Sequence, residues 1–312
     1  GLSLVNQQHF DLGEEEFNTA MALYAELPQG SVATEKLELS YNMGLLYLRW
    51  GRRVSAEREF RKVLADLHGR RTGLALAAET RLAQVLREQG EYAKALPLLQ
   101  SGMRHLQELY GPESSFVLIQ HDGLADLYRD SGNYAAAERQ YRERQRLSAI
   151  IDGVDSVNYS MGLYNYGALQ VLRGDVVQAE QLFRHAWAIR KERLGSESPT
   201  ALRAESGLGE LLMRQGRMNE ARQLLLHADA GLEAALPVDA PGRIEARLNR
   251  IAWHTLQGEL EQAHGLLGTL NPQVPTLLQL PLLRARADLS ERRGEGAAAL
   301  ALRRTALRFS LS

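Results

Sequence analysis

Seven glycines recur along the sequence at nearly constant intervals, and this repetition constrains the fold more than any other feature. Successive members lie 39, 42, 42, 42, 42 and 36 residues apart. A fixed period of about 20–50 residues is typical of proteins built from stacked structural repeats. We therefore interpret the chain as a series of similar units. The glycines are Gly51, Gly90, Gly132, Gly174, Gly216, Gly258 and Gly294.

Each interval contains the pattern of two helices separated by a tight turn. A small residue stands seven positions before each of the first five glycines, and an alanine stands five positions after every glycine. A large apolar residue follows the first six alanines by four positions, one helical turn along the same face. We expect the small residue to let the second helix pack closely, and the glycine to end the first helix in the left-handed conformation. The small residues are Gly44, Ala83, Ala125, Gly167 and Gly209; the alanines are Ala56, Ala95, Ala137, Ala179, Ala221, Ala263 and Ala299; the large residues are Phe60, Leu99, Tyr141, Phe183, Leu225 and Leu267.

These signals predict an all-α fold, because a helix hairpin buries its apolar stripe only by stacking on its neighbours. We expect one α-solenoid of about seven to eight antiparallel helix hairpins across residues 1–312, with a degenerate first hairpin turning at Gly13. Ile251 takes the small-residue position of the sixth repeat, so that hairpin is expected to be shifted or splayed. Arg303 replaces a large apolar residue in the last unit, as a polar cap requires. The predicted units are 2–30, 34–70, 73–110, 115–150, 157–194, 199–236, 241–271 and 276–309.

The order small, aromatic, glycine, alanine, aromatic, alanine resembles the tetratricopeptide repeat. The 42-residue period is similar to the longer repeats of kinesin light chains and of many bacterial regulatory proteins. The connections Tyr110-Gly111-Pro112-Glu113-Ser114 and Leu194-Gly195-Ser196-Glu197-Ser198-Pro199 also resemble that subtype. The resemblance implies a right-handed superhelix whose concave groove is lined by the first helix of each hairpin, called the A helix.

A set of polar and aromatic residues on the A helices is predicted to line this groove. They lie within a turn or so of the small residue and are mixed in charge, unlike a helix face meant for burial. Asparagine recurs at one equivalent position, where the resemblance implies contact with the backbone of a bound peptide; the alternative is a bond within the array. The candidates are Tyr41, Asn42, Arg81, Gln84, Asp122, Asp126, Tyr164, Asn165, Arg203, Glu210 and Asn249.

Composition argues against several other classes of function. The net charge of −1 provides no strong field for nucleic acid. No apolar run approaches the roughly 20 residues of a membrane-spanning helix. The chain contains no cysteine, no phosphate-binding glycine loop and no His-Glu-x-x-His pair. We therefore expect no metal, no cofactor and no catalysis, and we interpret Asp122 and Asp126 as a partner-facing acidic spot beside Arg129.

The sequence thus predicts a scaffold that binds a protein or peptide in its groove, as the sensing or docking region of a larger bacterial regulator such as a transcriptional regulator or kinase. Charge reversal at Asp122, Asp126 or Arg203 is expected to weaken partner binding and leave the array folded. One alternative is a sensor of a small ligand or signalling peptide that changes the shape of the superhelix; an RNA-binding helical repeat is less favoured. Because the chain starts at Gly1, we interpret it as a segment of a longer protein. A cytoplasmic location is expected, with a periplasmic portion of a membrane-anchored regulator as the alternative, and a homo-oligomer is compatible with the sequence.

Overall fold

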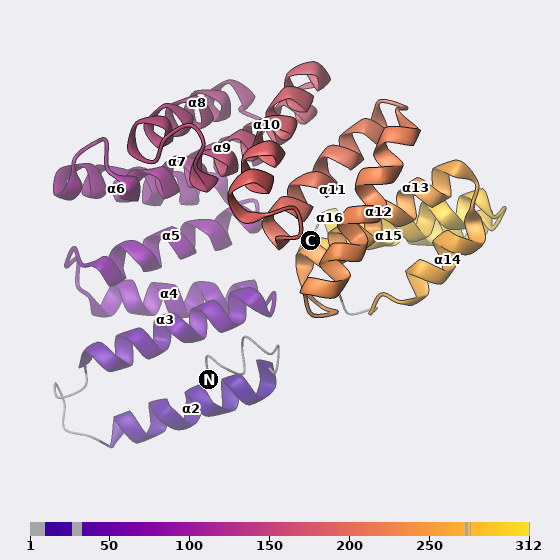
Figure 1. Cartoon of the computed structure of the whole chain (residues 1–312). Helices are drawn as coiled ribbons and strands as arrows, with labels where there is room; N and C mark the ends of the chain where they lie inside the picture. The colour runs from indigo at the N-terminus through magenta and orange to yellow at the C-terminus, as the bar shows by residue number, and fades with distance from the viewer. Residues whose placement is uncertain (1–9, 27–32, 272–273, 275, 312) are drawn as a thin grey trace. The chain divides into compact units, whose positions relative to one another are not determined.

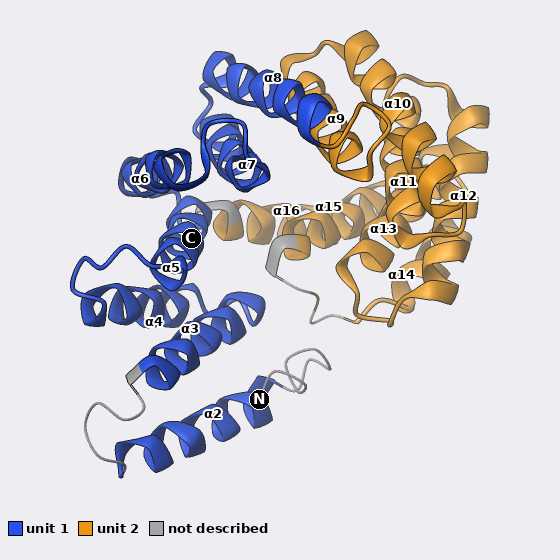
Figure 2. Ribbon diagram, turned by 60° about the vertical axis from the view of Figure 1, so that its left-hand side comes forward, with its two compact units in different colours: residues 1–151 blue, residues 152–312 orange. Residues whose placement is uncertain are grey.

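The computed structural model describes residues 10–26, 33–271, 274 and 276–311. Over these ranges every regular element is an α-helix, labelled in Figure 1. The chain divides into two compact units, Gly1–Ile151 and Asp152–Ser312, which are coloured separately in Figure 2. Each unit is considered by itself below.

The described residues of unit 1 form a single helix followed by three helix hairpins. The leading helix is α2 (Phe10–Ala25), and it packs on α3. The hairpins are α3 (Ala33–Arg49) with α4 (Arg53–Asp66), α5 (Gly73–Glu88) with α6 (Tyr92–Tyr110), and α7 (Ser115–Asp130) with α8 (Tyr134–Ile151). The second helix of a hairpin also packs on the first helix of the next, as α4 does on α5 and α6 on α7.

Unit 2 repeats this arrangement over four hairpins. They are α9 (Val157–Arg173) with α10 (Val176–Leu194), α11 (Pro199–Arg214) with α12 (Met218–Ala235), α13 (Pro241–Gln257) with α14 (Leu260–Gly268), and α15 (Thr276–Arg292) with α16 (Gly296–Leu311). Neighbouring hairpins are again in contact, through α10 with α11 and α12 with α13. The predicted all-α fold of stacked helix hairpins is therefore confirmed.

The recurring glycines close the turns inside the hairpins. All seven have φ between 77° and 81°, in the left-handed region that glycine enters without a Cβ penalty. The predicted helix-ending role of these glycines is confirmed. A second series, Gly69, Gly111, Gly153 and Gly195, also has positive φ and occupies connections between one hairpin and the next. Its members recur at the same interval as the central turn glycines. A glycine with positive φ therefore occurs both in the turn inside a hairpin and in the connection to the next hairpin.

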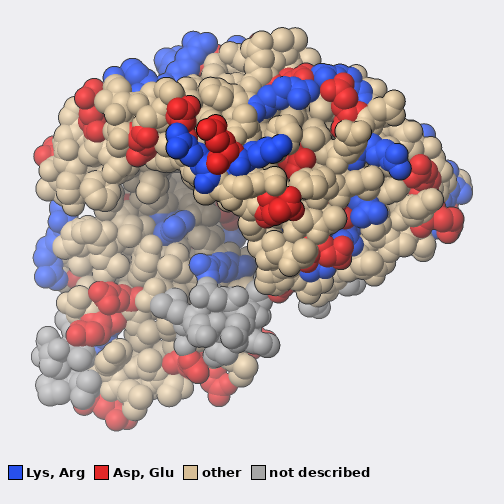
Figure 3. Space-filling view, in the orientation of Figure 1, with Lys and Arg blue, Asp and Glu red and all other residues tan. Residues whose placement is uncertain are grey.

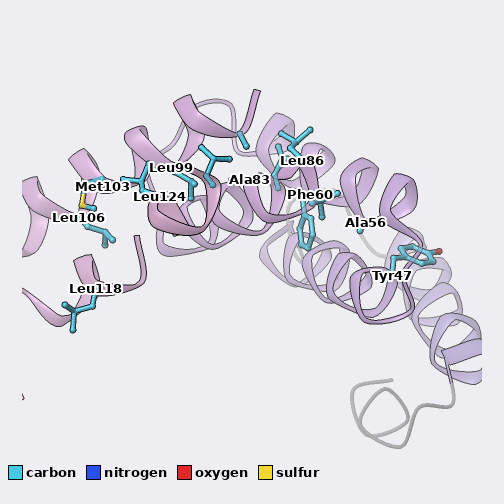
Figure 4. Close-up of a cluster of buried hydrophobic side chains, with 14 of the residues drawn as sticks. Tyr47, Ala56, Phe60, Ala83, Leu86, Leu99, Met103, Leu106, Leu118 and Leu124 are labelled. Atoms are coloured by element: carbon cyan, nitrogen blue, oxygen red, sulfur yellow. The ribbon is translucent and has the colours of Figure 1, made fainter. Parts of the chain in front are cut away.

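The small residue of each A helix faces the large apolar residue of its own second helix. A Cβ added to Gly44 would lie 2.6 Å from the ring of Phe60, and one added to Gly167 would lie 2.7 Å from the ring of Phe183. At Gly209 the nearest atom would belong to Leu225, at 2.8 Å. The large residues form continuous cores with their neighbours, as Figure 4 shows for the cluster around Phe60 and Leu99 in unit 1. The predicted steric reason for the small residue is confirmed.

Both ends of the array depart from the regular pattern. Gly13 lies buried inside α2, so the expected turn at this glycine is wrong; residues 2–9 and 27–30 of the predicted first hairpin lie outside the described residues. In the sixth repeat Ile251 is fully buried, and α14 is only 9 residues long. Arg303 of α16 is exposed and pairs with Asp288 and Glu291 on α15. Among the described residues, no helix is long and apolar enough to cross a membrane.

Candidate functional site

The A helices share one face that stays largely accessible to solvent within each unit. Its positions lie six and two residues before the small residue, and one and five residues after it. Steps of four, three and four residues place them on one side of a helix. In unit 1 the face consists of Glu38, Asn42, Leu45 and Arg49 on α3; Ala77, Arg81, Gln84 and Glu88 on α5; and Ile119, Gly123, Asp126 and Asp130 on α7.

Unit 2 carries the same face on α9, α11 and α13. Its members are Met161, Asn165, Ala168, Leu172, Arg203, Gly207, Glu210, Arg214, Glu245, Asn249, Ala252 and Leu256. Across both units every residue of the set is exposed or half-buried, except Gly207. We call this set the exposed A-helix face.

Eight of the eleven predicted groove residues lie on the exposed A-helix face. These are Asn42, Arg81, Gln84, Asp126, Asn165, Arg203, Glu210 and Asn249. The remaining three, Tyr41, Asp122 and Tyr164, each precede the small residue by three positions, which turns their side chains toward neighbouring helices.

The two tyrosines are packing residues. The Tyr41 ring lies 5.7 Å from the ring of Phe60, and the Tyr164 ring stacks on Phe183 at 4.8 Å. Tyr164 also covers Gly207 of α11, where an added Cβ would lie 2.3 Å from the tyrosine hydroxyl. Burial, together with the negative charges of Glu210 and Glu245, raises the pKa of Tyr164 to about 12. This residue therefore joins two A helices and stays neutral.

Asp122 compensates a buried cation. The guanidinium of Arg144, on α8, is 1% exposed, and its Nε donates to the Asp122 carboxylate at 3.2 Å. Arg203, by contrast, is 57% exposed, and Glu245 lies 3.6 Å away. The sequence analysis expects charge reversal at Asp122 and at Arg203 to have the same effect, but the two residues have different structural roles.

Replacing Asp122 by lysine should lower the free energy of unfolding by about 1.5–3 kcal/mol, because Arg144 loses a charge-assisted hydrogen bond. The matched reversal Arg203→Glu should lower it by less than about 1 kcal/mol, because it breaks an exposed ion pair with Glu245 and leaves the two carboxylates screened by solvent. Urea unfolding followed by circular dichroism measures both. Equal effects of the two reversals would show that Arg144 does not depend on Asp122.

Several polar groups of the face on α5 and α7 are bonded to one another or to neighbouring side chains. Arg81 donates to Gln84 at 3.0 Å, Gln84 donates to Glu88 at 3.1 Å, and Arg53 of α4 pairs with Glu88 at 3.4 Å. A second group links α5 with α7. There Arg87 pairs with Asp130 at 2.7 Å and lies 3.6 Å from Asp126.

Asp126 is held further by its own hairpin. Tyr141 of α8 donates its hydroxyl to Asp126 at 2.7 Å, and Arg129 pairs with the same oxygen at 2.9 Å. Burial and the neighbouring Asp126 carboxylate raise the pKa of Tyr141 well above its usual value, so this donor keeps its proton. A guest molecule that uses Asp126 would therefore share a carboxylate that is already bonded.

One of the three predicted asparagines, Asn249 of unit 2, is bonded within the array. Asn249 donates its amide to the hydroxyl of Ser206 on α11 at 3.1 Å, as the alternative interpretation expects. Asn42 and Asn165 make no side-chain hydrogen bond to any described residue, although both are half-buried. Their amides remain available as both donor and acceptor.

Sequence reasoning missed several residues of the face. Ile119, Met161 and Glu245 occupy the same position as Arg203, each one full repeat from the next member of the series. That constant interval is the signal that could have found them. Ile119 is 63% exposed and Met161 is 45% exposed, so the face carries apolar as well as polar side chains.

The surface has no region of one dominant charge in the view of Figure 3, where acidic and basic side chains are interspersed. Over the residues that the structure describes, no group of three or more His, Asp or Glu side chains is placed to hold a metal ion. The exposed A-helix face carries amides, charged groups and apolar side chains, which can form hydrogen bonds and packing contacts.

Known proteins share this architecture. Two profiles described as tetratricopeptide repeat match residues 74–150 and 171–200. No curated protein sequence matches this chain. Among solved structures, the putative kinesin light chain repeats of Podosopora anserina are 19% identical with a TM-score of 0.51, covering 70% of this chain and 96% of theirs.

Two further structures cover nearly the whole chain. NprR in complex with its cognate peptide NprX is 16% identical with a TM-score of 0.66, and covers 99% of this chain and 84% of its own. A Rap protein complexed with competence and sporulation factor is 12% identical with a TM-score of 0.64, with coverages of 99% and 95%. At these identities the likeness is one of fold. The chain is thus similar in fold to tetratricopeptide repeat proteins, and two of its segments, 74–150 and 171–200, match profiles of that repeat.

Proposed function

We propose that this chain is a scaffold that binds protein or peptide segments on its exposed A-helix face. The observation that carries the proposal is the recurrence of exposed or half-buried positions on successive A helices, with Asn42 and Asn165 making no side-chain hydrogen bond to the described residues. A half-buried amide without a partner has lost part of its hydration and gains by bonding to a ligand.

The residues of the face suit an extended guest segment. An asparagine amide both donates and accepts, so it can bond to the N–H and C=O groups of a peptide backbone whatever the guest's sequence. The apolar Met161 and Leu172 lie on the same face of α9 as Asn165 and can pack against guest side chains. This combination supports recognition of a polypeptide more than of a nucleic acid, which requires clustered basic residues.

The structural neighbours support the same class of ligand. NprR is a protein whose structure contains a cognate peptide, and the Rap protein was solved with competence and sporulation factor. By analogy with these proteins, we propose that the chain serves as the sensing or docking region of a regulatory protein. The guest would then be a peptide signal or a segment of a partner protein.

The Asn165 amide provides the sharpest test. Peptides selected from a displayed random library on the full chain should bind wild type, and Asn165→Ala should weaken the best of them about tenfold, the equivalent of about 1.4 kcal/mol. That loss is within the range for a hydrogen-bonding group left unpaired. Isothermal titration calorimetry gives both dissociation constants.

Asn219→Ala is the matched control. Asn219 is an exposed asparagine on α12 of the same unit, outside the exposed A-helix face, and its removal should leave peptide affinity unchanged. If no peptide is enriched, or if the Asn165 and Asn219 variants bind equally well, the A-helix face is not the binding surface.

A further inference from the structure

A cavity of about 180 Å³ lies inside unit 1, away from the exposed A-helix face. It is open to solvent on one side and is lined by the end of α4, the connection 69–72, the first two turns of α5 and the middle of α6. Leu64, Leu67 and Leu76 give it an apolar wall, and Glu79, Ser101 and His105 give it a polar one. None of these residues belongs to the candidate site described above.

The three polar side chains of this wall are not held by hydrogen bonds to any described residue, although His105 and Arg71 lie near enough to attract the Glu79 carboxylate. Among the described residues, Glu79, Ser101 and His105 make no side-chain hydrogen bond or ion pair, and all three are half-buried. Glu88, on the same helix as Glu79, receives bonds from both Arg53 and Gln84. Burial raises the pKa of Glu79, and the nearby His105 and Arg71 act in the opposite direction. A carboxylate in such a place gains strongly from a charged donor.

The other side of the cavity is electropositive. Arg70 and Arg71 belong to the connection that forms this wall. Arg71 pairs with Glu108 at 2.8 Å, and the Nε of Arg70 donates to the carbonyl of Leu67 at 3.2 Å. The N-terminus of α5 begins directly afterwards, where Thr72 caps the amide of Ala75 at 3.1 Å. A helix N-terminus adds partial positive charge to that of the guanidinium groups.

We propose that this cavity binds a free aliphatic α-amino acid. The ligand's ammonium group bonds to the Glu79 carboxylate, its carboxylate lies beside Arg70 and the start of α5, and its side chain packs on Leu64, Leu67 and Leu76. The volume of about 180 Å³ leaves room for several non-hydrogen atoms of a ligand. It is below the roughly 300 Å³ at which drug-sized ligands fit, so the size also selects a small molecule. This site is independent of the proposed peptide binding.

Calorimetric titration of the full chain with L-leucine tests the proposal, followed by the other natural amino acids. We expect saturable binding of L-leucine, a loss of at least about tenfold in affinity for Glu79→Gln, and no binding of N-acetyl-L-leucine, which lacks the ammonium charge. Ser101→Phe, which fills the cavity without removing a charge, should abolish binding as well. Circular dichroism checks that each variant is folded.

Glu38→Gln is the control, because Glu38 is an exposed carboxylate of the same unit on the exposed A-helix face. It should bind L-leucine like wild type, as should Asn165→Ala, while Glu79→Gln should leave peptide binding unchanged. The proposal is overturned if no amino acid produces either binding heat or a rise in melting temperature, which any ligand of the folded form must cause. It is equally overturned if Glu79→Gln binds as tightly as wild type.

Discussion

Replacing Asp229 by alanine should lower the free energy of unfolding of unit 2 by about 3–5 kcal/mol. Asp229 of α12 is 0% exposed, and both of its oxygens accept from the Nε of Arg247, at 2.8 and 2.9 Å. Arg250 adds a third bond at 2.9 Å. Without the aspartate, the buried Arg247 keeps its positive charge, and the one anion it retains among the described residues is Glu233, a carboxylate that is 48% exposed. Urea unfolding monitored by circular dichroism measures the difference.

Two other variants distinguish the effect of breaking the buried ion pair from the effect of removing any aspartate charge. Asp288→Ala removes an aspartate that is 62% exposed and lies 3.5 Å from Arg303, so its cost should stay below about 1 kcal/mol. The double variant Asp229→Leu/Arg247→Met replaces the buried pair by apolar groups, and it should recover much of the stability lost in the single variant. A single variant as stable as wild type would mean that Glu233 or water suffices to compensate Arg247.

The second large effect concerns helix packing inside a hairpin. Gly167→Ala should destabilise unit 2 by about 1–3 kcal/mol, because its Cβ would lie 2.7 Å from two ring atoms of Phe183 and the hairpin must open to admit it. The intrinsic preference of alanine for helices opposes this by only about 1 kcal/mol. Thermal and urea unfolding of the purified variant give the net change.

Gly265 provides the same substitution without the contact. It lies in α14 of the same unit, and a Cβ there would meet no atom within 4 Å. Gly265→Ala should therefore stabilise the unit by up to about 1 kcal/mol, through helix propensity alone. The two alanine variants are expected to shift stability in opposite directions. Shifts of the same sign would contradict the steric role of the small residue.

The helix hairpins could be predicted from sequence because their signals are local. Gly167 and Phe183 belong to one hairpin, and the turn glycine Gly174 lies between them in the chain. A left-handed glycine, a small residue and an apolar stripe act within one hairpin. Because the same pattern recurs in several repeats, the helices and turns can be assigned even where one copy of the pattern is weak. The turn expected at Gly13 was wrong because that segment has no repeated counterpart against which the pattern could be checked.

The candidate site could be predicted only in part. The A-helix positions followed from the repeat register, and this placed Asn42, Asn165 and Arg203 on the exposed A-helix face. The register alone did not show that Tyr164 covers Gly207 on the following A helix, or that Asn249 bonds to Ser206. These pairings depend on how closely two A helices approach and on which rotamer each side chain adopts.

The sequence by itself determined the hairpin, its turn and the face along which the A helices are exposed, because a periodic pattern fixes each of these within a single repeat. Only the tertiary structure decided which polar groups are already bonded and which are not. Asp122 is bonded to Arg144, whereas Glu79 makes no hydrogen bond or ion pair with the described residues and lines a cavity between three helices. The physical reason is that a polar side chain is satisfied by whichever donor or acceptor packing brings within about 3 Å. That neighbour comes from another helix, at a distance along the chain that no local pattern encodes.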